Sequence, residues 1–174
     1  MIQIKTIHLD ETDIAIVKDY AKYVLNKFVK RSVQSKALIR VKIATEDDFD
    51  DPADLDDLRK YRAWCTYDGV QNDKRCFTVI LNARQVRKTA KKPLTRLKQL
   101  LIDFGHELVH VKQYLNSEVF DYTSGGCRYK GSYFGTEYHN DLELYYDSPW
   151  EVESYGRELG LYKVFVEKYK NKYI

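Results

Sequence analysis

The sequence predicts one α+β domain over residues 1–174, with an N-terminal helix, a small mixed β-sheet, a long central helix, an irregular Gly/Tyr-rich segment and a C-terminal helix. The chain has 174 residues, which suits a single domain. Apolar residues make up 44% of it, which is enough to form a core. Helix-type and strand-type apolar spacings follow one another in the order helix, strands, helix, irregular segment, helix, which is typical of an α+β protein.

The first helix and the first strand are predicted from the spacing of apolar side chains. Residues 12–31 carry apolar side chains three and four positions apart, which predicts an amphipathic helix capped by Asp10 or Thr12. Residues 37–44 alternate between apolar and other side chains, as a half-buried strand does. Residues 46–57 include eight acidic residues and lack the ligand spacing of a calcium loop, so we interpret them as a solvated loop.

A β-hairpin is predicted after the acidic segment. Residues 61–67 and 76–82 are rich in aromatic and β-branched side chains, which favour strands. The turn-forming pairs Asp68-Gly69 and Asn72-Asp73 lie between them, so we expect a hairpin with a longer loop. An edge at residues 76–82 would allow an extended peptide to pair with this strand.

The second half of the chain is predicted to contain two helices. A strong helical pattern runs near residues 94–118, directly after a proline. Residues 84–98 include seven basic residues, which we interpret as a solvated helix start, with a phosphate-binding patch as the alternative. Residues 119–140 are expected to form loops with one or two short strands. A last helix is expected from Pro149 to the C-terminus, with a kink or break at Gly160.

Composition narrows the classes of function. A net charge of +3 is too small to indicate a nucleic-acid partner by itself. The three cysteines, Cys65, Cys76 and Cys127, form no C-x-x-C motif, which favours reduced thiols over a disulfide framework or a cysteine zinc site. The N-terminus does not resemble a signal peptide, and no run of about 20 apolar residues occurs. We therefore expect a cytoplasmic protein with no membrane partner.

The motif His106-Glu107-Leu108-Val109-His110 lies in the predicted central helix. His106 and His110 are one helical turn apart on one face, so both imidazoles can reach one metal ion. Glu107 lies about 100° further round, where it can act as a base toward a water at that ion. The alternative is a solvated polar face. The apolar residues of the helix form a stripe on the opposite side, which predicts that the histidines face a cleft: Leu97, Leu100, Leu101, Phe104, Leu108, Val111 and Leu115.

A catalytic zinc site needs a third protein ligand besides the two histidines and leaves one position for water. The candidates are the other histidines and the acidic residues late in the chain: His8, His139, Asp141, Glu143, Asp147, Glu151, Glu153 and Glu158.

A family resemblance indicates which candidate completes the site. The sequence HELVHVKQY, the Gly/Tyr-rich segment and the later sequence PWEVESYGRE resemble small phage-encoded zinc metallopeptidases of the gluzincin, SprT-like group. The resemblance covers residues 100–165 and implies Zn²⁺ as the cofactor. It implies His106, His110 and Glu151 as ligands, with Glu153 as the rival third ligand. It further implies that Glu107 is the general base and that the substrate is a peptide or protein.

The chain departs from that family in two respects. Many gluzincins place an Asp a few residues after the ligand Glu to orient a ligand histidine, whereas Tyr155 stands at this position. The cysteine-rich zinc ribbon of many SprT-like proteins does not follow the motif, so a DNA-repair role is not expected.

Other functions and one catalytic group stay open at this point. A non-catalytic protein with a metal-stabilised fold and a nucleic-acid-associated protein that binds through residues 84–98 are the alternatives. A second electrophile usually holds the negative charge that develops on the substrate carbonyl. Its candidates are His139, Tyr138, Tyr145, Tyr146 and Tyr155.

Overall fold

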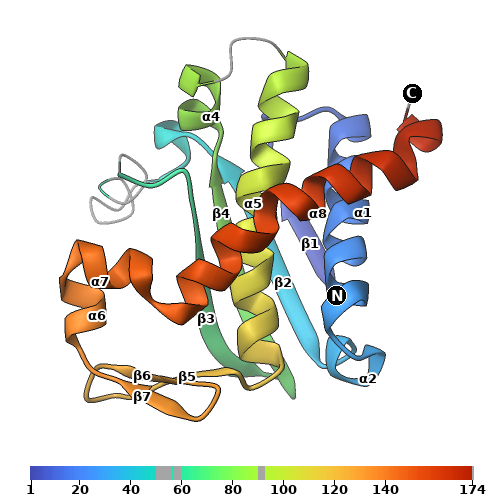
Figure 1. Cartoon of the computed structure of the whole chain (residues 1–174). Coiled ribbons are helices and arrows are strands. Elements are labelled where there is room, and N and C mark those ends of the chain that lie inside the picture. The colour runs from blue at the N-terminus through green and yellow to red at the C-terminus, as the bar shows by residue number, and fades with distance from the viewer. Residues whose placement is uncertain (50–55, 57–59, 90–92, 174) are drawn as a thin grey trace.

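The computed structural model describes residues 1–49, 56, 60–89 and 93–173 and confirms the α+β class (Figure 1). The elements follow one another as β1 (Ile2–Lys5), α1 (Glu11–Phe28), α2 (Arg31–Gln34), β2 (Ala37–Ala44), the 3₁₀ helix η1 (Glu46–Asp48), β3 (Ala63–Gln71), β4 (Lys74–Asn82), α4 (Ala83–Thr89), α5 (Pro93–Leu115), β5 (Val119–Asp121), β6 (Cys127–Tyr129), β7 (Ser132–Phe134), α6 (Glu137–Asn140), α7 (Leu142–Asp147) and α8 (Pro149–Tyr173).

The main sheet has the strand order β1-β2-β4-β3. Strands β1, β2 and β4 are parallel, and β3 is antiparallel to β4. The parallel pair β1 and β2 requires a crossover connection, which α1 provides. Since β4 lies between β2 and β3, the prediction that residues 76–82 offer an edge to a peptide is wrong. Strand β3 forms the edge on that side of the sheet.

Three layers are stacked in the molecule. Helices α1 and α5 lie side by side over one face of the sheet, and α8 crosses α5 on its outer side (Figure 1). In β2 the side chains of Ala37, Ile39, Val41 and Ile43 are buried, as the alternating pattern predicts. The predicted apolar stripe of α5 is buried from Leu100 onward. The core therefore lies between the sheet and the inner faces of α1 and α5.

The predicted long loop of the hairpin is wrong, because β3 and β4 are joined by only two residues. Asn72 and Asp73 both have positive φ, 49° and 58°, as a two-residue primed turn requires. Gly69 has φ 81° and lies where the register of β3 against β4 shifts. The pair Asp68-Gly69 thus forms a β-bulge within the strand instead of part of the turn.

The helices differ in detail from the predicted ones. Helix α1 ends at Phe28, and Asp10 caps its start by accepting a hydrogen bond from the backbone N–H of Asp13 at 2.8 Å. Helix α8 continues through Gly160, so the predicted break there is wrong. A glycine inside a helix costs only about 1 kcal/mol, and the buried side chains of Leu161 and Phe165 hold the following turns against the core.

The Gly/Tyr-rich segment contains three short strands, one more than the upper end of the prediction. Strands β5, β6 and β7 form an antiparallel sheet. Its inner face packs on Trp150 at the start of α8 through Val119, Cys127 and Tyr129. This small sheet therefore anchors the first turn of α8.

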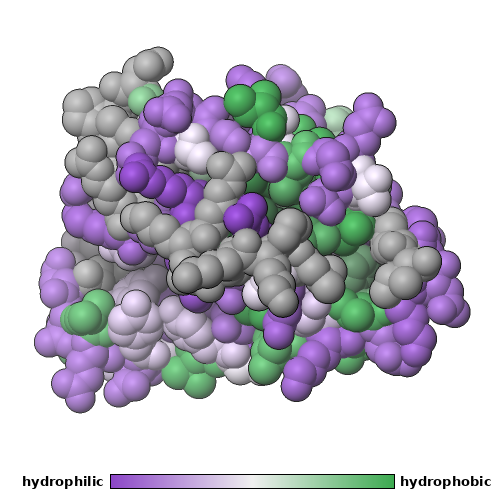
Figure 2. All heavy atoms as spheres, turned by 90° about the horizontal axis from the view of Figure 1, so that it is seen from above, coloured by the Kyte–Doolittle hydropathy of each residue, from purple (hydrophilic) through white to green (hydrophobic). Residues whose placement is uncertain are grey.

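Two of the predicted segments lie partly outside the described part of the chain. Residues 50–55 and 57 of the acidic segment and residues 90–92 of the basic segment are not described. Seen from above, the described residues on this face are mostly hydrophilic, with apolar residues in separate groups (Figure 2). All three cysteines are free thiols. Within the described ranges, no helix is both long and apolar enough to traverse a bilayer.

Candidate metal centre

The His106 to His110 motif lies in the middle of α5, on the side that α8 crosses. The residues His106 and Glu107 are only 8% and 6% exposed, and His110 is partly buried. The alternative of a solvated polar face is therefore wrong. A polar group that is buried in this way needs a partner, because losing its hydration costs free energy.

Glu151, on the first turn of α8, meets both imidazoles. Its Oε2 lies 3.2 Å from Nε2 of His106, and its Oε1 lies 3.3 Å from Nε2 of His110. The two Nε2 atoms are themselves 3.2 Å apart. These three buried or partly buried residues form a group that could hold a metal ion.

The spacing of the three donor atoms fits a tetrahedral ion. Two ligand atoms that each lie about 2.0–2.1 Å from a tetrahedral zinc are about 3.3–3.4 Å apart. The observed separations are 3.2 to 3.3 Å. A charge-assisted hydrogen bond between nitrogen and oxygen is shorter, at about 2.7–2.9 Å. The triangle of donors therefore has the spacing that one common cation needs.

The other nitrogen of each ring has a partner that orients it. Nδ1 of His106 lies 3.1 Å from Oε2 of Glu158, and Nδ1 of His110 lies 3.0 Å from Oε1 of Gln113. Both partners are oxygen acceptors, so each Nδ1 must carry the proton that it donates. Each Nε2 is then the nitrogen that faces Glu151 and is available to a metal.

Electrostatics within the group favour charged side chains when no metal is bound. Burial would raise the pKa of Glu151, but hydrogen bonds with His106 and His110 outweigh it and hold that pKa well below its ordinary range. Burial would likewise lower the pKa of His106, but hydrogen bonds to Glu151 and Glu158 raise it to about 10. At neutral pH the metal-free His106 is thus protonated, and a metal that binds must release this proton.

Glu107 lies beside the group without belonging to it. Burial raises the pKa of its carboxyl above the ordinary range, against the attraction of His110 and His106. Glu107 lines a cleft of about 680 Å³ together with both histidines and Glu151. A carboxylate with a raised pKa in a cleft is suited to accepting and returning a proton.

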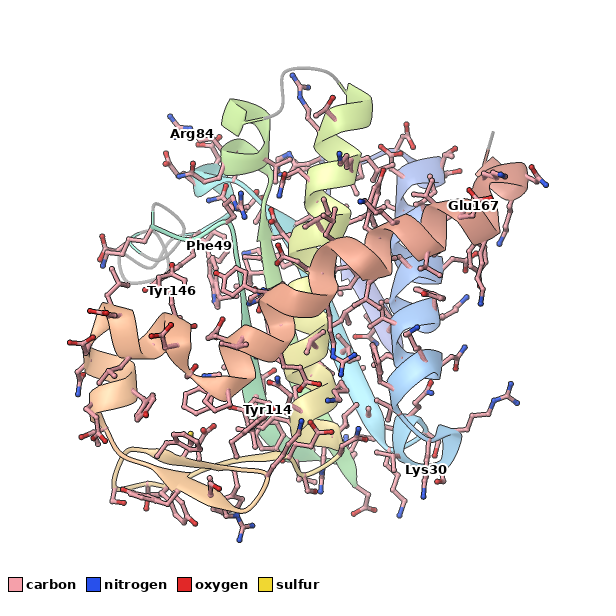
Figure 3. All side chains as sticks on the ribbon, viewed as in Figure 1. Lys30, Phe49, Arg84, Tyr114, Tyr146 and Glu167 are labelled. Atoms are coloured by element: carbon pink, nitrogen blue, oxygen red, sulfur yellow. The ribbon has the colours of Figure 1, made fainter. Side chains whose placement is uncertain are left out.

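The wall of the cleft opposite α5 comes from α7, α8 and the edge strand β3. Tyr145 of α7 has a raised pKa because of burial, the negative charge of Glu151 and a hydrogen bond to it. The ring centroid of Tyr155 lies 4.4 Å from that of His106. Tyr146 on α7 and Tyr114 on α5 also line the cleft and are labelled in Figure 3.

Glu153, the rival third ligand, points to a different set of partners. Its Oε1 accepts a hydrogen bond from Nζ of the buried Lys112 at 2.8 Å, and its Oε2 accepts from the Tyr129 hydroxyl, also at 2.8 Å. Nε of Arg157 also donates a hydrogen bond to Oε1 of Glu153 at 2.9 Å. Glu153 therefore joins α8 to α5 and to the small sheet instead of joining the donor group.

Several other candidates have partners outside the donor group. His8 contacts Asp48 at 2.8 Å. Asp141 caps α7 through the backbone N–H of Leu144. Tyr138 packs against Trp150 and Phe134, and the side chain of His139 lies outside the described part of the chain.

Sequence reasoning did not assign Gln113 or Glu158 their roles beside the histidines. Gln113 is three residues after His110, a spacing that brings helical side chains together. Glu158 is seven residues after Glu151, so the two share one face of α8. Helical spacing was therefore a usable signal in both cases.

No protein-family model, curated protein or solved structure matches this chain.

Proposed function

We propose that this protein is a zinc-dependent metallopeptidase with Glu107 as its general base. The observation that carries the proposal is the buried His106, His110 and Glu151 donor group beside Glu107 in an open cleft. Two imidazoles and one carboxylate are a common ligand set of catalytic zinc, with a fourth position left for water.

A bound zinc ion and the side chains of the protein would have different roles in the reaction. Zinc supplies a lowered pKa for the attacking water, toward about 7, and polarisation of the substrate carbonyl. Glu107 takes the proton of the water and passes it to the leaving amine. Tyr145 and Tyr155, which stand in the same cleft, are the candidates that donate a hydrogen bond to the carbonyl oxygen as charge develops on it.

The substrate is an extended peptide segment that lies along β3. This strand is the edge of the sheet, and Ala63, Trp64 and Cys65 of it line the cleft. The backbone of an edge strand can pair with an added strand, which brings a peptide bond past the donor group.

The test compares wild type with Glu107→Gln, using a denatured protein as the substrate. Both proteins should hold about one zinc per chain, and the variant should lose about 10²- to 10⁴-fold in hydrolysis rate, the usual contribution of a general base. Glu167→Gln, at an exposed position of α8, is the matched control and should leave the rate unchanged. Equal rates in wild type and Glu107→Gln would refute the proposal.

A non-catalytic role for the metal is the second candidate function. It is favoured by the origin of the donors, because His106 and His110 come from α5 and Glu151 from α8. A bound ion would therefore lock these helices together. A higher melting temperature with zinc and no hydrolysis at all would support this candidate. Nucleic-acid binding through residues 84–98 stays a prediction, to be tested by the salt dependence of binding.

A further inference from the structure

The mouth of the cleft is rimmed by exposed apolar side chains. Tyr61, Leu142, Tyr146 and Tyr155 line the cleft, and each is between 45% and 72% exposed. Scattered exposed apolar residues are ordinary, but a set gathered around one opening indicates a binding surface.

The aromatic rings form a continuous path from this mouth to the donor group. The ring centroids of Tyr145 and Tyr146 are 5.5 Å apart, and those of Tyr146 and Tyr155 are 5.9 Å apart. Tyr155 in turn contacts the His106 ring at 4.4 Å. A large apolar side chain beside the donor group would therefore be in contact with Tyr155 and Tyr146.

Charge in the cleft opposes acidic ligands. The lysine and arginine among its described lining residues are Lys60 and Arg62, which pair with Asp56 and Asp103 at 2.5 and 3.2 Å. Because Lys60 is offset by Asp56, which does not line the cleft, a divalent ion and Arg62 together offset three of the five lining carboxylates. The lining therefore keeps negative charge in excess, even when Glu107 is replaced by Gln. The five lining carboxylates are Asp103, Glu107, Asp141, Glu151 and Glu158.

We propose that the cleft selects an extended polypeptide segment that places a large apolar side chain on Tyr146 and Tyr155 and has no carboxylate near it. This substrate class rests on the proposed function for the cleavage step. The selective binding itself follows from the apolar rim, the charge of the lining and the edge position of β3.

The test measures binding apart from turnover, on the full-length Glu107→Gln protein loaded with zinc. The probes are three fluorescein-labelled decapeptides that differ only in a central Phe, Ser or Glu, and the readout is fluorescence anisotropy. The Phe peptide should bind about 10-fold more tightly than the Ser peptide, because burying an aromatic side chain increases affinity by at least that factor. The Glu peptide should bind more weakly than the Ser peptide, by a margin that shrinks as salt is added.

Matched variants identify the side chains that cause the preference for the Phe peptide over the Ser peptide. Tyr146→Ser should reduce the preference for Phe over Ser about 3- to 10-fold, as expected for a lost aromatic contact. Tyr133→Ser removes a tyrosine that is 66% exposed on β7 and lines no part of the cleft, so it should leave the preference unchanged. Leu142→Ser, at the most exposed rim position, is the second variant if Tyr146→Ser does not fold.

Each outcome separates this inference from the proposed function. Equal binding of the Phe and Ser peptides, tighter binding of the Glu peptide, no binding at all, or equal effects of Tyr146→Ser and Tyr133→Ser would overturn the inference, even if the wild type hydrolyses proteins. Selective binding of the Phe peptide without any hydrolysis by wild type would support the inference and overturn the proposed function.

Discussion

Glu151→Gln tests the donor group most directly. The substitution keeps the volume of the side chain and removes the carboxylate whose two oxygens contact His106 and His110 at 3.2 and 3.3 Å. Structural sites with four ligands bind zinc with a free energy of about 10–16 kcal/mol, so each ligand contributes about 3–4 kcal/mol. We therefore expect zinc affinity to fall by about 10²- to 10³-fold.

The assay is competition for zinc with a chromophoric chelator, together with elemental analysis of the purified proteins. Glu153→Gln is the matched control, because Glu153 lies on the same helix but binds Lys112 and Tyr129. It should lower thermal stability and change zinc affinity by less than about 10-fold. Wild-type zinc affinity in Glu151→Gln, or an equal loss in both variants, would refute the assignment of the third donor.

Three further predictions concern the surroundings of the site. Replacing Gln113 by Leu removes the acceptor of the His110 Nδ1–H and should weaken zinc binding about 10- to 100-fold in the same chelator competition; an unchanged affinity would show that the ring needs no such support. Burial would raise the pKa of Glu153, but hydrogen bonds, that from Lys112 foremost, lower it from 4.5 to about 2. The stabilisation of the fold by ionised Glu153 is therefore fully present above pH 4.5 and is lost as pH falls toward 2. The free energy of unfolding in urea should depend less on pH in that range for Glu153→Gln than for wild type. Parallel curves for the two proteins would contradict this. In Gly105→Ala the new methyl group would overlap the hydroxyl of the buried Tyr20, at an expected cost of about 1–3 kcal/mol in the free energy of unfolding. Adding Tyr20→Phe should recover most of this loss, and a failure to recover it would rule out the overlap as the cause.

Local patterns predicted most of the elements of this fold. Strand β2 has the predicted bounds, and the helical spacing identified α1, α5 and α8. Strand β1 was missed, although Ile2 and Ile4 alternate with polar residues, because four residues are too few to distinguish a strand without its partner. The hairpin turn was misplaced because two turn-forming pairs lie four residues apart. Only the pairing of β3 with β4 shows that one of them is a bulge.

The order of strands in the sheet depends on contacts between distant segments. The sequence indicates that residues 76–82 form a strand, but not which strands lie on each side of it. Pairing with both β2 and β3 places β4 inside the sheet and leaves the edge to β3. Since register and neighbours arise from non-local packing, no periodicity within the segment could have supplied them.

The sequence by itself determined that His106 and His110 share one face of a helix with Glu107 beside them, because helical geometry depends only on local spacing. It left two histidines and six acidic residues as candidates for the third donor, and the family resemblance pointed to Glu151 with Glu153 as the rival. Only the tertiary structure shows that Glu151 meets the imidazoles and Glu153 does not, since the two lie about 200° apart around α8. Burial of Trp150, Ser154, Leu161 and Phe165 sets the rotation of α8 against the rest of the molecule, and this rotation turns Glu151 toward the imidazoles and Glu153 toward Lys112.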